Sequence, residues 1–227
     1  MDPVRFTTED GLSLQGELRL PEGDAKGSAV VCHAHPRHGG SKDHPLLWAI
    51  RNELAQRGFA VLAFNFRGVM GSSGAYDGGV AEILDARAAI GRVRRETDGP
   101  TLLAGWSFGA NVALRTAVDD DRPEALALVG LALDPREIEV PDLPDALALG
   151  SLRRPTLLIA GDDDPFCPPD GLRAVGGRLP GSEVVVVEGA DHYFSHRERE
   201  VASIIGGFAG RTLTDDPPHP GRSPSPR

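Results

Sequence analysis

Two patterns of apolar positions follow one another along the chain. In residues 7–21, leucines recur at alternate positions after Asp10-Gly11, a dipeptide typical of tight turns, and this predicts a β-hairpin. From Ser28 onward, short apolar runs alternate with amphipathic stretches, which predicts strands alternating with helices. We expect strands at 28–32, 59–66, 100–104, 125–133, 155–160 and 183–188, and helices at 45–57, 80–95, 107–118, 171–179 and around Ile204.

This order of elements predicts the fold class. Strands joined through helices form right-handed crossovers, so we expect an α/β protein with a mostly parallel sheet flanked by helices. The apolar run at 59–66, broken only by Asn65, suits a strand that is covered on both faces. We expect a single domain over residues 1–212, followed by a proline-rich, disordered tail at 213–227.

Composition and charge narrow the function classes. Hydrophobic residues make up 40% of the 227 residues and charged residues 25%, as in ordinary globular proteins. The net charge of −9 disfavours nucleic acid or an anionic membrane as the main partner. Residues 1–8 contain charges and no apolar run, and no stretch approaches the ~18 apolar residues of a membrane helix, so we expect a cytoplasmic protein without a signal peptide. Cys32 and Cys167 are expected to be reduced.

The pentapeptide Gly105-Trp-Ser-Phe-Gly109 lies between a predicted strand and a predicted helix. A strand that turns abruptly into a helix holds its apical residue in a strained conformation, and side chains two residues before and after it would collide. Glycine at both flanks avoids that collision, and Ser107 at the apex stands clear of the sheet beside a helix N-terminus. The pattern therefore predicts a nucleophilic serine; a chance match in a glycine-rich chain would lack this strand-to-helix setting.

An acid and a base follow Ser107 in the order that this arrangement requires. Three aspartates, 162–164, come directly after a predicted strand, at the edge of the sheet where catalytic groups gather. His192 also follows a predicted strand. This histidine would take the proton of Ser107 and return it to the leaving group, while an aspartate orients its ring. The three adjacent aspartates leave the choice of acid open, and Asp134, after another strand, is the fallback.

These motifs resemble the α/β-hydrolase superfamily, and more narrowly its small lidless branch related to dienelactone hydrolases. The similarity spans roughly residues 28–210. It departs from that branch at Ala34, within a usual His-Pro-His-Pro, and at Met70, within a usual Arg-Gly-Val-Gly; Ser107 stands where dienelactone hydrolases proper have a cysteine. The residues that carry the resemblance are His33, His35, Pro36, Gly39, Gly40, Phe64, Asn65, Phe66, Arg67, Gly68, Val69, Ser72, Gly74, Asp77, Glu82, Gly105, Ser107, Gly109, Gly161, Asp164, Pro168, Gly189 and His192.

The resemblance implies an α/β-hydrolase fold without a substantial lid domain. Lids of such enzymes usually lie in the interval that here spans 133–155, which has room only for a loop and a short helix, so we expect an open site. The acid of such enzymes lies three residues after a strand-ending glycine and four before a proline, which selects Asp164. The oxyanion donors implied by similarity are the backbone N–H groups of Phe108 and His35.

Three side chains each have two possible roles. Arg67 either anchors its loop through carboxylates such as Asp77 or contacts an anionic substrate. Trp106 either packs in the core or forms a wall of the substrate site, as does Phe108.

The competing hypothesis for an enzyme is a zinc-dependent hydrolase. His33, His35 and His38 have the outline of a His-x-His-x-Asp-His cluster, whose imidazoles could bind zinc and activate water. Arg37 stands where the metal-binding aspartate belongs, which places a permanent cation against the metal. A further alternative retains the fold as a binding module without catalysis.

We expect a serine hydrolase that cleaves a carboxylic ester, thioester or related acyl bond through an acyl-enzyme. The catalytic residues would be Ser107, Asp164 and His192. This chemistry needs no metal and no cofactor, and its partner would be a small acyl substrate rather than nucleic acid or a membrane. The sequence contains no signal for the oligomeric state.

Overall fold

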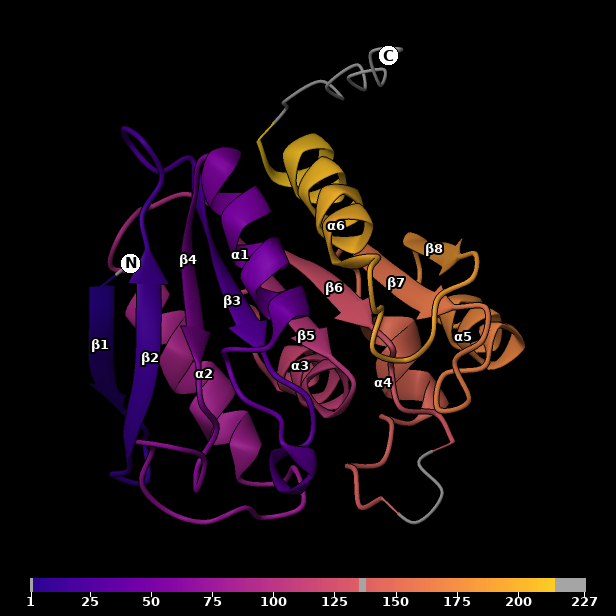
Figure 1. Ribbon diagram of the computed structural model, residues 1–227, viewed down its shortest axis with the longest axis horizontal. Coiled ribbons are helices and arrows are strands. Elements are labelled where there is room, and N and C mark those ends of the chain that lie inside the picture. The colour runs from indigo at the N-terminus through magenta and orange to yellow at the C-terminus, as the bar shows by residue number, and fades with distance from the viewer. Residues whose placement is uncertain (1, 135–137, 215–227) are drawn as a thin grey trace.

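The computed structural model describes residues 2–134 and 138–214. In this part of the chain, an eight-stranded sheet has the strand order β1-β2-β4-β3-β5-β6-β7-β8 (Figure 1). Strand β2 runs antiparallel to both of its neighbours, and β3 to β8 are parallel to one another. The strands are β1 (Asp2–Thr7), β2 (Ser13–Arg19), β3 (Gly27–Cys32), β4 (Phe59–Phe64), β5 (Thr101–Trp106), β6 (Ala125–Val129), β7 (Thr156–Gly161) and β8 (Ser182–Val187).

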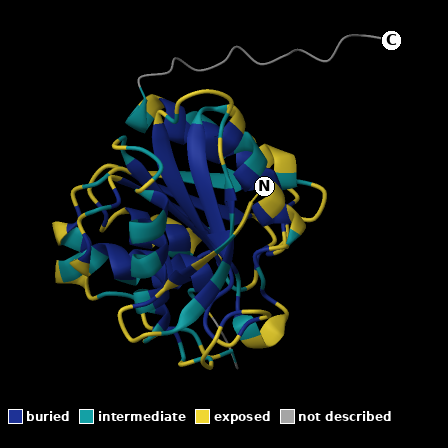
Figure 2. Ribbon diagram, turned by 90° about the vertical axis from the view of Figure 1, so that its left-hand side faces the viewer, coloured by how far each residue is buried: buried dark blue, intermediate teal, exposed yellow. Residues whose placement is uncertain are grey.

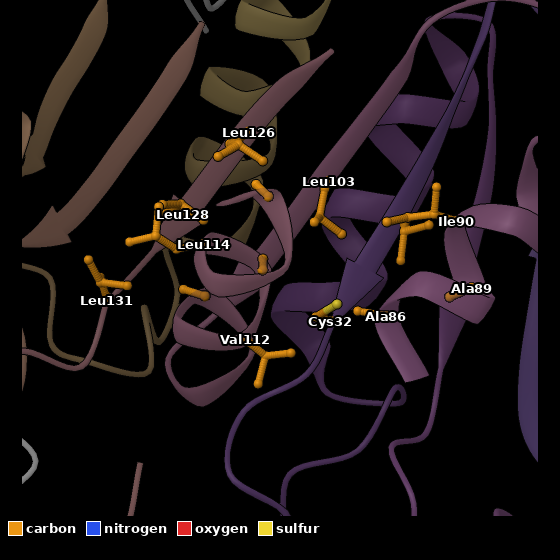
Figure 3. Packing of buried hydrophobic residues seen from close by; sticks show 14 of the residues in the cluster. Cys32, Ala86, Ala89, Ile90, Leu103, Val112, Leu114, Leu126, Leu128 and Leu131 are labelled. Atoms are coloured by element: carbon orange, nitrogen blue, oxygen red, sulfur yellow. The ribbon is translucent and has the colours of Figure 1, made fainter. Parts of the chain in front are cut away.

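Helices cover both faces of this sheet. The α1 (Pro45–Gln56) and α6 (Glu198–Leu213) helices pack on one face, and α2 (Glu82–Val93), α3 (Phe108–Asp119) and α5 (Pro169–Gly176) on the other (Figure 1). Side chains alternate along each strand, so Ala29 faces the first layer and Val30 the second. Figure 3 shows the second of these cores, around Cys32, between the sheet, α2 and α3.

Burial on both faces explains the long apolar runs. All residues of β3 to β7 are buried, whereas the edge strands β1 and β8 are partly exposed, and Figure 2 shows this buried centre. The predicted fold class, a mostly parallel sheet flanked by helices, is therefore confirmed.

Several predicted boundaries shift. The hairpin turns at Gly11 as expected, but its first strand begins at Asp2. Strand β6 ends at Val129 instead of residue 133 because Gly130, with φ of +54°, turns the chain away from the sheet. Strand β4 ends at Phe64, two residues earlier than expected, and α2 is shorter than its predicted range. Helix α5 begins two residues before its predicted range and ends three residues before the end of that range.

The segment after β6 contains a short helix, α4 (Ala146–Ser151), and no lid domain in its described part. Asn111 of α3 fastens the start of this segment: its amide oxygen accepts from the Ala132 N–H (3.0 Å) and its amide nitrogen donates to the carbonyls of Ala132 (3.1 Å) and Pro141 (3.3 Å). The segment is therefore held on the body of the protein. The tail predicted from residue 213 begins later, because α6 extends to Leu213, and its remainder from 215 onward lies outside the described residues.

Candidate active site

Ser107 lies at the sharp turn between β5 and α3. Its backbone φ is +55° and its ψ is −123°, a conformation that side-chain-bearing residues rarely adopt. A Cβ atom on Gly105 would lie 2.2 Å from the Gly109 carbonyl oxygen, and one on Gly109 would lie 2.5 Å from the Cys32 carbonyl oxygen. Both flanking glycines are therefore required by the close approach of three backbone segments, as the pentapeptide predicts.

His192 and Asp164 complete a hydrogen-bonded chain with Ser107. The His192 Nε2 atom lies 2.9 Å from Ser107 Oγ, and the His192 Nδ1 atom lies 2.8 Å from Asp164 Oδ2. All three side chains are buried or nearly so, with 8% of Ser107, 2% of Asp164 and 7% of His192 exposed. They come from the ends of β5, β7 and β8, which meet at one edge of the sheet.

The structure distinguishes the four candidate aspartates. The second oxygen of Asp164 accepts the backbone N–H groups of Phe166 (2.9 Å) and Cys167 (3.0 Å), which fixes this carboxylate against the His192 ring. Asp162 instead accepts the Ala190 N–H (3.2 Å) and so holds the loop before His192. Asp163 and the fallback Asp134 are exposed, so Asp164 is the aspartate placed to orient His192.

Gly130 is a part of the site that the sequence reasoning missed. A Cβ atom at this position would lie 3.2 Å from His192 Cε1 and 3.5 Å from Asp164 Oδ2. Its φ of +54° adds a second reason for glycine. The only available signal was a glycine within the apolar run 125–133, all of which we assigned to one strand.

Trp106 lies in the core and also contacts the pocket beside Ser107. Its ring is 2% exposed and belongs to the core beneath α1 and α6, and its Nε1–H donates to the His192 carbonyl (3.1 Å). It also lines the pocket that opens beside Ser107. The indole therefore supports the loop that carries His192 while forming part of a wall.

The pocket beside Ser107 and His192 has mainly apolar and aromatic walls. Ile138 and Val140 come from the segment after β6, and Phe166 and Tyr193 follow Asp164 and His192 in the chain. The rings of Phe166 and His192 lie 4.9 Å apart. Sequence reasoning did not select these four residues, although Phe166 and Tyr193 are adjacent to predicted catalytic positions. Such walls suit an organic group of small or medium size.

The residues of the two predicted oxyanion donors both lie close to Ser107, one next to it in the chain and one in the same pocket. Phe108 is the first residue of α3, and the N–H groups of a first helical turn have no acceptor within their helix. His35 lies in the loop after β3, lines the same pocket, and caps the short helix η1 (Pro36–His38). Their ring centroids are 5.3 Å apart. Phe108 itself is fully buried, so its side chain belongs to the core rather than to the substrate wall.

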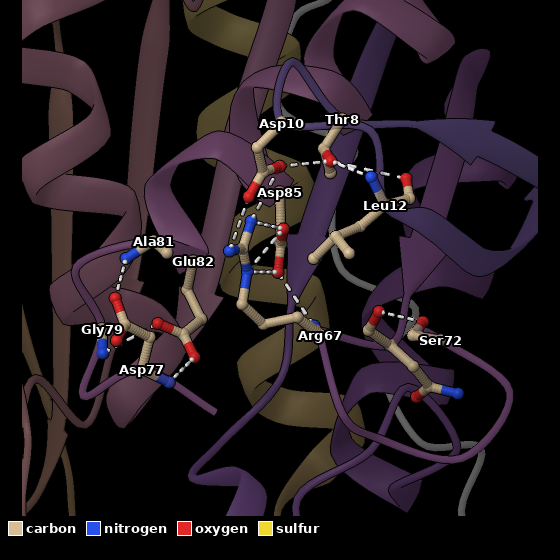
Figure 4. A network of polar contacts seen from close by, with 11 residues as sticks. Thr8, Asp10, Leu12, Arg67, Ser72, Asp77, Gly79, Ala81, Glu82 and Asp85 are labelled. Atoms are coloured by element: carbon tan, nitrogen blue, oxygen red, sulfur yellow. Dashed lines mark hydrogen bonds and ion pairs between the residues drawn. The ribbon is translucent and has the colours of Figure 1, made fainter. Parts of the chain in front are cut away.

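Arg67 requires a correction. Its guanidinium bonds Asp85 (Nη2 to Oδ1, 2.7 Å) and Asp10 (Nη1 to Oδ2, 2.9 Å), and not Asp77 (Figure 4). The side chain is 6% exposed and does not line the pocket, so the expectation that it contacts an anionic substrate is wrong. Asp77 instead accepts the Ala81 N–H (3.2 Å) at the start of α2. Arg67 fastens the β1–β2 hairpin to α2.

The three histidines of the zinc hypothesis do not converge. His33 accepts the Phe66 N–H at Nε2 (3.0 Å), so its Nδ1 carries the proton and donates to the Ala34 carbonyl (2.6 Å). Both nitrogens of this ring are thus occupied inside the protein. Among the described residues, no group of three or more His, Cys, Asp or Glu side chains is arranged to hold a metal.

Burial also controls the titration of several groups around the site. It lowers the pKa of the His33 ring to about 4 and lowers the pKa of the His35 and His44 rings. Cys32 and Cys167 are buried free thiols, as expected, and burial raises the pKa of both, so neither supplies a thiolate nucleophile. None of the helices in the described ranges is long and apolar enough to cross a membrane.

A sequence model of the α/β hydrolase domain matches residues 27–204. Together with the fold and this edge-of-sheet site, the match defines the class: the chain belongs to the α/β-hydrolase family. An uncharacterised protein of Rickettsia prowazekii is 28% identical over 188 residues, covering 79% of this chain and 77% of that protein.

Solved structures of the same class are similar along nearly the whole chain. A lidless α/β serine hydrolase from Xanthomonas campestris has 27% identity and a TM-score of 0.79, with 95% of this chain and 96% of that chain covered. An α/β serine hydrolase homologue from Coxiella burnetii also has 27% identity and a TM-score of 0.79, with 90% and 95% covered. The protein is therefore an α/β hydrolase of lidless architecture.

Proposed function

We propose that this protein is a serine hydrolase that cleaves a carboxylic ester, thioester or related acyl bond through an acyl-enzyme. The observation that carries the proposal is the hydrogen-bonded chain from Ser107 Oγ through His192 to Asp164. The similarity to a serine hydrolase and to a serine hydrolase homologue, each at 27% identity, supports it. The apolar pocket beside Ser107 supports a small organic acyl compound as the substrate.

In the proposed mechanism each group of the hydrogen-bonded chain has one role. With Nδ1–H donating to Asp164, the neutral His192 ring presents a free Nε2 lone pair to the Ser107 hydroxyl. As Ser107 Oγ attacks the carbonyl carbon, its proton moves to Nε2, and the carbonyl oxygen becomes negative within reach of the Phe108 and His35 N–H groups. The leaving group departs with the proton from His192. Water, activated by the same nitrogen, then releases the acid and restores Ser107.

Steady-state kinetics on short activated esters test this assignment. Ser107→Ala should lower kcat by about three to six orders of magnitude without loss of the fold, because it removes the attacking oxygen. Asp164→Asn should lower kcat by about 10⁴-fold, since an amide favours the wrong ring tautomer. The matched control is Asp134→Asn, which changes an exposed aspartate after another strand and should leave kcat unaltered.

Two outcomes would contradict the proposal. Retention of the wild-type rate by Ser107→Ala would exclude this residue as the nucleophile. Absence of any turnover by the wild type, together with no labelling by a fluorophosphonate, would favour a non-catalytic binding protein.

A further inference from the structure

A cluster of three aromatic rings includes the side chains of both residues predicted to supply the oxyanion donors. Its members are His35 from the loop after β3, Tyr76 from the loop after β4, and Phe108 from the start of α3. The ring centroids are 5.0 Å apart for His35 and Tyr76, 5.3 Å for His35 and Phe108, and 5.7 Å for Tyr76 and Phe108. Each ring thus contacts the other two, and two of the three residues carry the proposed donor N–H groups.

The hydrogen bonds of His35 fix its tautomer. Its Nδ1 accepts the Arg37 N–H (3.1 Å), so the ring proton resides on Nε2. The Nε2–H then donates to the Glu139 carbonyl oxygen (2.7 Å). The His35 carbonyl also accepts the N–H groups of His38 (3.1 Å) and Gly40 (3.0 Å). Both the ring and the backbone of His35 are therefore held at the start of η1.

Tyr76 donates to the same carbonyl. Its Oη lies 2.6 Å from the Glu139 carbonyl oxygen and 3.0 Å from His35 Nε2. The Arg37 guanidinium lies over the Tyr76 ring at 4.7 Å, a favourable cation–π position. Burial raises the pKa of Tyr76 to about 12, so the phenol retains the proton that it donates.

The Glu139 carbonyl joins this cluster to the substrate pocket. Glu139 lies between Ile138 and Val140, which line the pocket wall beside Ser107. The side chains of His35 and Tyr76 thus both donate to the Glu139 carbonyl, and this connects the loop after β3 to the pocket wall. A change at either donor would let the His35 backbone move relative to Ser107, and misplacement of a catalytic group by about 1 Å can be costly.

Building on the proposed function, we propose that Tyr76 and the His35 ring are positioning residues of the oxyanion hole. By donating together to the Glu139 carbonyl, they hold the His35 N–H where the substrate carbonyl oxygen becomes negative. Neither side chain takes part in bond making; each acts through the backbone of the loop after β3. The hydroxyl of Tyr76 is the part of this arrangement that can be removed alone, since Tyr76→Phe retains the ring contacts with His35 and Phe108.

The test compares wild type and Tyr76→Phe on a short-chain 4-nitrophenyl ester. We expect kcat to fall about 10- to 100-fold and KM to stay within about threefold of the wild-type value. This loss of kcat is smaller than the loss expected when an oxyanion donor itself is removed. The matched control is Ser182→Ala, which removes a hydroxyl-to-carbonyl bond of 2.8 Å to Gly176 between α5 and β8, at the opposite edge of the sheet. This control should retain the wild-type kcat, and circular dichroism should show all three proteins folded.

A second substrate separates a positioning role from a merely structural one. In the thiono analogue of the same ester, sulfur replaces the carbonyl oxygen and accepts hydrogen bonds only weakly. Wild type should therefore strongly prefer the oxygen ester, and Tyr76→Phe should reduce this preference by about the same factor as kcat. An unchanged kcat, or a lower kcat with the wild-type preference intact, would overturn the inference. If the wild type hydrolyses neither ester, or Ser107→Ala remains active, the proposed function itself fails.

Discussion

Positive φ values at residues with side chains occur in the two loops that carry Ser107 and His192 and at one position elsewhere. Ser107 adopts φ of +55° at the elbow, and Phe194 and His196 adopt +54° and +64° just after His192. Such conformations cost free energy and persist where the surrounding structure enforces them. Met70, with φ of +50°, is different because it is 76% exposed and lies in the loop after β4, at the position where the resemblance noted from the sequence leads us to expect glycine.

We expect Met70→Gly to stabilise the protein by about 0.5–1 kcal/mol, because glycine adopts this backbone conformation without steric strain and the exposed side chain loses little packing. Urea unfolding measures the difference in the free energy of unfolding. The control is Met70→Ala, which keeps the Cβ atom and should give no such gain. Equal stability of the glycine and alanine variants would contradict strain as the cause.

At the scale of elements, buried polar side chains join segments that the sheet alone does not connect. Arg67, with Asp85 and Asp10, connects the β1–β2 hairpin to α2 (Figure 4). His33 joins the end of β3 to the chain after β4, because its fully buried ring accepts the Phe66 N–H. Protonation of that ring would remove the acceptor and leave a charge in the interior.

This makes His33 a source of pH-dependent stability. Its pKa is about 4 in the folded protein against an ordinary value of 6.5, so the unfolded chain binds more protons between these limits. Stability from His33 is therefore complete above pH 6.5 and is lost as the pH falls toward 4. Between pH 7 and pH 5 we expect about 2 kcal/mol of this loss, at about 1.4 kcal/mol per pH unit.

Urea unfolding at the two pH values, with wild type and His33→Gln, measures this loss. The glutamine variant is less stable at pH 7 but has no imidazole to titrate, so its free energy of unfolding should fall less on acidification. The same pH dependence in both proteins would assign the effect to other groups.

For the whole molecule, the sequence predicted what depends on local patterns. The elbow required two glycines around Ser107, and the alternation of strands and helices determined which edge of the sheet collects Asp164 and His192. Contacts between distant loops could not be read in the same way. Arg67 is nearer in sequence to Asp77 than to Asp85, yet the folded chain brings Asp85 and Asp10 to it.

The contacts that support the site could not be predicted from the sequence either. Tyr76 and Glu139 are 63 positions apart, and the phenol-to-carbonyl bond between them follows no local motif. Gly130 serves the site through a backbone angle and through its distance from His192, and neither can be seen in a run of apolar residues. Tertiary packing, rather than residue type, determines whether such residues belong to the site.

The central claim is that Ser107, activated by His192, is the nucleophile. Fluorophosphonate labelling followed by mass spectrometric peptide mapping tests it most directly, because the reagent forms a stable phosphonyl ester with an activated serine. We predict one adduct per chain, located on Ser107, and much slower labelling of His192→Gln. A folded wild-type protein that takes no label, or carries it on another residue, would contradict the account.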